Sequence, residues 1–178
     1  MKHLVATLTL STLVFSCHQK NKTMEYKNGF KVIGIAVETT NEEGKSAEDI
    51  GRLWHKFYEE EIPQKIPSRE GEEVYSIYTD YESDYQRKYT AIIGMKVSSL
   101  DSVPSGLVGR EFEGGNYLKF VAMGKMPDAV AKTWQQIWNE DEELNRKYTA
   151  DFEIYDAKSQ NGEGSEVAIL IATEGNAQ

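Results

Sequence analysis

The chain has 178 residues and a formal net charge of −9, and 28% of its residues are charged. This length suits one domain with a single substantial core, and the acidic balance disfavours nucleic acids and anionic lipid surfaces as partners. The sequence holds no Gly-x-Ser-x-Gly, no cysteine pair, no His-Glu-x-x-His and no phosphate-binding glycine loop, which excludes the common nucleophilic, zinc and nucleotide sites.

The N-terminal segment has the pattern of an export signal. A short basic start precedes the run 4–15 of apolar and small residues, which is shorter than the roughly 20 residues that span a bilayer. Residues 1–16 are therefore predicted to be a signal peptide. Val-Phe-Ser-Cys at 14–17 resembles the lipobox of bacterial lipoproteins, although Phe15 is bulkier than the usual residue there. We expect a lipid on Cys17, the only cysteine of the chain, to anchor the protein to a membrane of the bacterial cell envelope, outside the cytoplasm.

The rest of the chain divides by composition. Residues 17–28 are polar and aperiodic after the cysteine, which predicts a lipidated, flexible tether. Residues 29–174 are expected to form the folded domain, and residues 175–178 a short tail.

Two helices are predicted from apolar residues spaced three and four apart, at 47–60 and 127–140. Strands are expected at 31–39, 73–79, 89–97, 107–113, 117–123, 152–156 and 166–173. The pair Gly114-Gly115 predicts a tight hairpin turn between two of these strands.

An internal repeat organises these elements. Residues 75–78 (Tyr-Ser-Ile-Tyr) align with 152–155 (Phe-Glu-Ile-Tyr) at an offset of 77 residues, and Ala-Ile-Ile at 91–93 aligns with Ala-Ile-Leu at 168–170 at the same offset. Each half is expected to run strand, helix, strand, strand, with 107–113 joining them. The predicted fold class is α+β: a duplicated βαββ unit with pseudo-twofold symmetry, whose antiparallel sheet, two helices and central cleft could hold a ligand.

Glu153 is the candidate centre of that cleft. In a strand over 151–155, Glu153 and Tyr155 share one face while Phe152 and Ile154 take the other. The repeat has Ser76 in the equivalent place, so the duplicated fold does not require a carboxylate there. A buried carboxylate should have a raised pKa or be held by donors such as tyrosine hydroxyls. The alternative is a solvated glutamate on an exposed sheet face.

A family resemblance covers about residues 30–174. It is carried by the ordered segments Tyr-Thr-Ala-Ile-Ile-Gly-Met-Lys-Val at 89–97, Val-Pro-Ser-Gly-Leu at 103–107, Gly-Gly-Asn-Tyr at 114–117, Met-Pro at 126–127, Thr-Trp-Gln-Gln-Ile-Trp at 133–138 and Asp-Phe-Glu-Ile-Tyr at 151–155. Together they resemble the GyrI-like, AraC-type effector-binding domain. The resemblance implies a pocket for hydrophobic, often cationic, small molecules, with Glu153 at its floor. Relatives are fused to helix-turn-helix segments in multidrug-responsive regulators or stand alone, and no room for such a segment is expected between Cys17 and the domain.

Two functions follow from these observations. The first is a binding module in which aromatic rings surround a ligand and Glu153 meets its positive charge; the expected ligand-binding residues are Trp54, Tyr78, Tyr117, Trp134, Trp138, Glu153 and Tyr155. The alternative is a hydrolase that opens electrophilic, cyclopropane-bearing molecules, with Glu153 catalytic. The tryptophans also fit ordinary core packing.

No metal ion and no cofactor is expected. The related SOUL-type haem-binding fold is disfavoured, because His55 is the only histidine inside the domain and a single helical histidine is a weak indication of an axial ligand. The expected partners are the ligand and, through the lipid on Cys17, the membrane.

Overall fold

The computed structural model describes residues 22–175. The predicted signal peptide, Cys17 and most of the predicted tail lie outside the described residues. The described strands and α-helices are, in chain order, β1 (Thr23–Lys27), β2 (Phe30–Thr40), α1 (Lys45–Glu59), α2 (Ile62–Lys65), β3 (Arg69–Thr79), β4 (Lys88–Val97), β5 (Val108–Phe112), β6 (Gly115–Met123), α3 (Asp128–Asn139), β7 (Ala150–Tyr155) and β8 (Glu166–Ala172).

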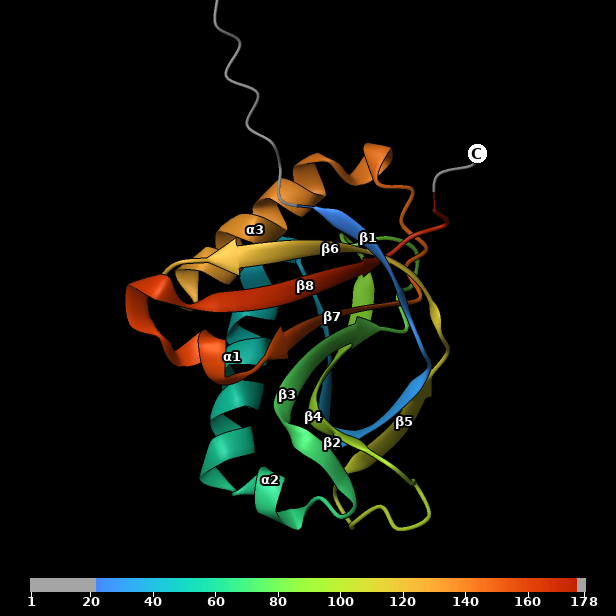
Figure 1. Cartoon of the computed structure of the whole chain (residues 1–178), viewed down its shortest axis with the longest axis vertical. Helices are drawn as coiled ribbons and strands as arrows, with labels where there is room; N and C mark the ends of the chain where they lie inside the picture. The colour runs from blue at the N-terminus through green and yellow to red at the C-terminus, as the bar shows by residue number, and fades with distance from the viewer. Residues whose placement is uncertain (1–21, 176–178) are drawn as a thin grey trace, which may run out of the picture.

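The described strands form one antiparallel sheet of eight strands in the order β1-β6-β8-β7-β3-β4-β2-β5. The sheet curls into a half-barrel, with β1 and β5 at its two ends (Figure 1). The order is symmetric about the β7–β3 contact, with β1-β6-β8-β7 on one side mirrored by β5-β2-β4-β3 on the other. The predicted α+β class and pseudo-twofold duplication are confirmed, and both long helices begin and end within two residues of the predicted bounds.

Each half gives its first strand to the other half. β1 precedes β2 in the chain but pairs with β6, and β5 precedes β6 but pairs with β2. The sequence prediction was wrong at two points here. Residues 23–27, assigned to the tether, form β1, whose Thr-Met-Glu-Tyr-Lys sequence has no apolar run that would indicate a strand.

The predicted hairpin at Gly114-Gly115 is the second error, because β5 and β6 pair with different halves. The links β1–β2 and β5–β6 instead pass close to each other. A Cβ on Gly29 would lie 2.9 Å from the carbonyl oxygen of Phe112, and a Cβ on Gly114 would lie 2.8 Å from that of Lys27. Glycine is needed at both positions because the two backbones approach so closely.

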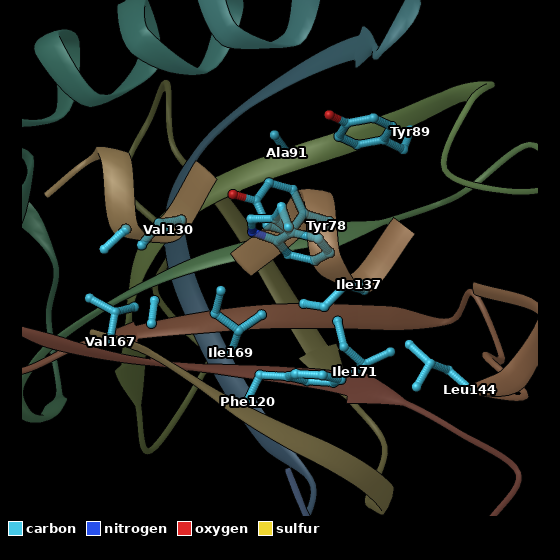
Figure 2. Packing of buried hydrophobic residues seen from close by; sticks show 13 residues of the cluster. Tyr78, Tyr89, Ala91, Phe120, Val130, Ile137, Leu144, Val167, Ile169 and Ile171 are labelled. Atoms are coloured by element: carbon cyan, nitrogen blue, oxygen red, sulfur yellow. The ribbon is translucent and has the colours of Figure 1, made fainter. Parts of the chain in front are cut away.

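The two faces of the sheet carry different cores. On one face, α1 covers Ile33, Ile93 and neighbours, while α3 covers Ile169 and neighbours. Figure 2 shows part of this face, with Val167, Ile169 and Ile171 of β8 near Val130 and Ile137 of α3. The opposite face holds an aromatic cluster around Phe30 and Phe152, whose ring centroids lie 5.2 Å apart.

Strand register corrects one part of the predicted repeat. In the first half Ala91 pairs with Tyr78, whose equivalent in the second half is Tyr155. If Ala168 were the equivalent of Ala91, it would pair with Tyr155, but it pairs with Ile154. Ala91 accordingly lies in the core under α3, whereas Ala168 packs on the opposite face. The alignment of 91–93 with 168–170 is therefore wrong by one residue, and because side chains alternate along a strand this reverses the face.

Candidate functional site

A cavity of about 590 Å³ lies between the sheet and the helices α1 and α3. Its walls come from both halves of the repeat, as the predicted central cleft requires. The lining residues are Asn41, Gly44, Ser46, Ala47, Ile50, Gly51, Trp54, Tyr78, Tyr81, Tyr85, Tyr89, Pro127, Val130, Ala131, Trp134, Gln135, Trp138, Glu153 and Tyr155. Six of the seven residues expected to bind a ligand are brought together here.

Tyr117 is the exception. Its ring packs against Phe152 on the opposite face of the sheet, with centroids 5.1 Å apart, and it does not line the cavity. The prediction of Tyr117 as a ligand contact was wrong. Alternation along β6 could have shown this, because Phe120 and Ala122, at odd spacing from Tyr117, form the core under α3.

Glu153 projects from β7 into the cavity, as its place in the alternating strand predicts. Only 1% of its surface is exposed. One carboxylate oxygen, Oε1, accepts hydrogen bonds from the Tyr78 hydroxyl at 2.8 Å and from Trp134 Nε1 at 2.6 Å. The other, Oε2, accepts from the Tyr155 hydroxyl at 2.7 Å. The alternative of a solvated glutamate on an exposed face is therefore wrong.

The surroundings of Glu153 are polar but carry no positive charge. Within residues 22–175 Glu153 forms no ion pair, and its three donors are all neutral. Burial raises the pKa of Glu153, while hydrogen bonds from Tyr155, Trp134 and Tyr78 act in the opposite direction. Burial and the nearby carboxylate also raise the pKa of Tyr78 and Tyr155 above the ordinary tyrosine value, which keeps both hydroxyls protonated as donors.

Aromatic rings enclose this carboxylate. Trp54 of α1 meets Tyr155 edge to face at 4.9 Å between centroids, and Trp134 of α3 meets Tyr78 at 5.2 Å. Trp134 therefore packs in the core and also donates its indole N–H to Glu153. Electron-rich ring faces around a carboxylate suit a cation that carries apolar substituents.

The sequence prediction missed a second group of lining residues, from the ends and connection of β3 and β4. Tyr81, Tyr85 and Tyr89 extend the aromatic wall, and Tyr85 stacks on Trp138 at 5.5 Å between centroids. The Tyr89 hydroxyl donates to Asn41 Oδ1 at 2.8 Å. The dense run of tyrosines at 78, 81, 85 and 89 was the available signal, since loop tyrosines beside a predicted cleft often line it.

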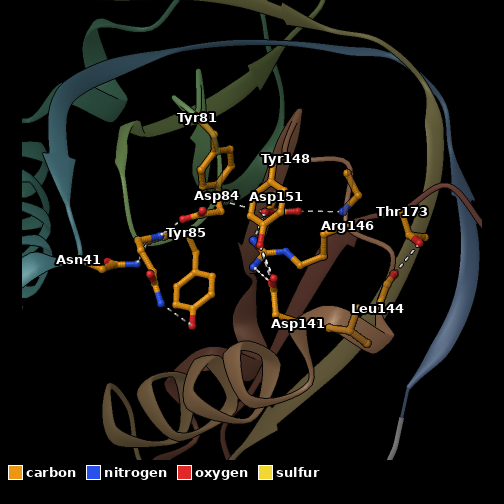
Figure 3. Close-up of polar contacts among 12 residues, drawn as sticks. Asn41, Tyr81, Asp84, Tyr85, Asp141, Leu144, Arg146, Tyr148, Asp151 and Thr173 are labelled. Atoms are coloured by element: carbon orange, nitrogen blue, oxygen red, sulfur yellow. Dashed lines mark hydrogen bonds and ion pairs between the residues drawn. The ribbon is translucent and has the colours of Figure 1, made fainter.

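The Tyr81 hydroxyl contacts a buried ionic cluster (Figure 3). The Tyr81 hydroxyl donates to Asp151 Oδ2 at 2.9 Å, and Arg146 Nη2 donates to the same oxygen at 2.7 Å. Arg146 also donates to Asp141, which accepts from the Tyr148 hydroxyl. Asp151 and Glu153 are thus two buried carboxylates on one face of β7. The first has a guanidinium partner, and the second has none within residues 22–175.

His55 lies on α1 outside the cavity lining, largely exposed, with Nδ1 3.1 Å from Glu59. No group of three or more histidine, cysteine or acidic side chains suited to a metal ion occurs within residues 22–175. No helix in that range is long and apolar enough to cross a membrane.

Known proteins share the sequence and fold of this chain. Residues 23–173 match the family described as Cass2, integron-associated effector binding protein. The chain belongs to the Cass2 family of effector-binding proteins. The Cass2 integron cassette protein from the mobile metagenome of Vibrio cholerae is 33% identical, with a TM-score of 0.68 over 85% of this chain and 94% of that one.

Two further proteins are similar to this Cass2-family chain at lower sequence identity. YobU of Bacillus subtilis (strain 168), named as a candidate transcriptional regulator, is 25% identical over 142 residues, which is 78% of this chain and 89% of YobU. The structure of SAV2435 bound to tetraphenylphosphonium shares the fold, with a TM-score of 0.72 and 16% identity over 86% of this chain and 94% of that one. The family supports small-molecule binding, and no finding favours the hydrolase alternative.

Proposed function

We propose that this Cass2-family domain binds small hydrophobic cations, with Glu153 as the counter-charge. The observation that carries the proposal is a fully buried carboxylate that lines a cavity and has only neutral hydrogen-bond partners within residues 22–175. An unpaired buried charge is unfavourable. A bound cation would remove that cost.

The shape and polarity of the cavity support the same ligand class. Apart from Glu153, its lining is aromatic, aliphatic or neutral polar, which suits a cation whose charge is surrounded by apolar groups. The tetraphenylphosphonium bound to SAV2435 is a ligand of that kind on the same fold. The net charge of −9 further favours the approach of cations.

The experiment compares two ligands of nearly equal shape, methyltriphenylphosphonium and the neutral triphenylphosphine oxide. Binding to the purified full chain is followed by tryptophan fluorescence, because Trp54, Trp134 and Trp138 line the cavity. Wild type should prefer the cation, and Glu153→Gln should bind the cation at least about tenfold more weakly, a change of about 1.4 kcal/mol. Equal affinity of wild type and Glu153→Gln for the cation would refute the proposal.

We also propose that the protein acts outside the cytoplasm, held to a membrane by a lipid on Cys17, and that it does not bind nucleic acid. The support is the signal-like run 4–15 before Cys17 and the acidic net charge. Cells that express wild type should hold the protein in the membrane fraction in a form that incorporates labelled fatty acid. Cys17→Ala should lose the label, and persistent labelling of this variant would contradict lipid attachment at Cys17.

A further inference from the structure

The cavity opens to solvent between α1 and α3. A lining residue that is itself exposed marks the rim of a cavity. On the α1 side these residues are Gly44, Ala47 and Gly51, and on the α3 side Pro127, Ala131 and Gln135.

This rim differs in composition from the rest of α1. The charged residues of that helix, among them Lys45, Glu48 and Arg52, do not line the cavity. The α1 rim is instead made of positions with a single methyl group or no side chain at all. The two helices therefore face each other across the opening with little side-chain bulk on the α1 side.

Neither backbone conformation nor packing explains the glycine at position 51. It lies near the middle of α1, where glycine is the least favourable residue after proline. It is not among the residues in the left-handed backbone region, so no turn requires it. A Cβ built on Gly51 would meet no atom within 4 Å, so no close packing requires it either.

We infer that Gly51 determines ligand selectivity by leaving the opening between α1 and α3 wide enough for thick, non-planar cations. The inference rests on the proposed function, which specifies the charge of the ligand, and it adds the size of the ligand. Glu153 selects the charge of the ligand at the floor of the cavity, and Gly51 sets how thick a ligand can be and still lie between the helices. A tetrahedral cation with several aryl groups needs that space, whereas a flat ring does not.

The test uses Gly51→Ala and Gly51→Leu, with Glu48→Leu as the matched control on an exposed face of α1 outside the cavity lining. The ligands are tetraphenylphosphonium, which is thick, and N-methylquinolinium, which is flat. We expect Gly51→Leu to lose at least tenfold in affinity for tetraphenylphosphonium and less than threefold for N-methylquinolinium. Glu48→Leu should bind both ligands as wild type does.

Thermal unfolding of the same full-length variants separates this role from a structural one. Gly51→Ala should raise the melting temperature by about 2–4 °C, because alanine favours the helix and nothing obstructs its methyl group. A lowered melting temperature would show that the fold itself needs the glycine and would overturn the inference. Equal loss of both ligands in Gly51→Leu, or no loss of either, would also overturn it.

The failure of the proposed function gives a different result. If wild type binds neither cation, or if Glu153→Gln binds both as well as wild type does, cation binding at Glu153 is refuted whatever Gly51→Leu does. If wild type binds both cations through Glu153 and Gly51→Leu does not discriminate between them, only the role of Gly51 fails.

Discussion

Ser76 and Glu153 lie directly opposite each other where β3 pairs with β7, and they are also equivalent residues of the two repeats. The pseudo-twofold axis therefore passes between them. Ser76 donates to the Tyr78 hydroxyl at 3.0 Å, and Tyr78 donates to Glu153. In a pair of identical halves the residue on the axis would face its own copy, so a glutamate there would be opposed by a second glutamate. Divergence of the halves allows a single carboxylate at the centre.

Cation binding should depend on pH through Glu153. Burial raises the pKa of this carboxyl above its ordinary value of 4.5, so protonation neutralises the site as the pH falls through that raised pKa. Below it, the dissociation constant for tetraphenylphosphonium should rise by up to about tenfold per pH unit. Fluorescence titrations between pH 8 and pH 4.5 would measure this. Glu153→Gln should give a flat profile over the same range, and a parallel slope in that variant would assign the effect to another group.

The stability of the unliganded protein should change with pH in the opposite sense. Because the folded pKa of Glu153 lies above the unfolded value, the folded state holds the proton more tightly. The contribution of Glu153 to the free energy of unfolding should therefore increase as the pH falls through the folded pKa, and level off below 4.5. Urea unfolding of wild type and Glu153→Gln at several pH values measures this contribution as the difference between their free energies of unfolding. A difference that does not vary with pH would contradict the raised pKa.

Removal of a hydrogen-bond donor to Glu153 should shift the pH profile of cation binding. Tyr155→Phe deletes the hydrogen bond to Glu153 Oε2, which stabilises the charged carboxylate, so the pKa of Glu153 should rise further. Cation binding should then be lost at a higher pH than in wild type, while affinity at high pH falls less than in Glu153→Gln. Tyr117→Phe is the matched control, because Tyr117 lies on the opposite face of the sheet. The same shift in both variants would point to a general effect on the fold.

The buried ionic cluster should contribute to stability rather than charge selection. Arg146→Met leaves Asp151 buried without its guanidinium, and loss of one partner of such a pair costs about 3–5 kcal/mol. The double variant with Asp151→Asn removes both charges and should recover part of this loss. Urea unfolding of wild type, both single variants and the double variant measures the coupling. Additive effects of the two substitutions would contradict it.

Much of the fold could be predicted because its signals are local. The apolar stripe of α1 and the alternation in β7 are dictated by burial against one face, so they placed Trp54 and Glu153 correctly. The exchange of β1 and β5 could not be predicted in this way, because strand pairing between distant segments leaves no periodic signal. Tyr81 and Tyr85 were missed for a similar reason, since their place in the wall depends on where the β3–β4 connection folds back.

The exchanged strands have a mechanical consequence for the cavity. Any hinge motion that parted the two halves would have to break the pairing of β1 with β6, of β5 with β2 and of β3 with β7 together. Because three strand pairings link the halves, the sheet resists separation, and Glu153 at its centre keeps its position relative to both halves. Adaptation to ligands of different size must then come from the other walls, the two helices and the tyrosine-bearing connection between β3 and β4.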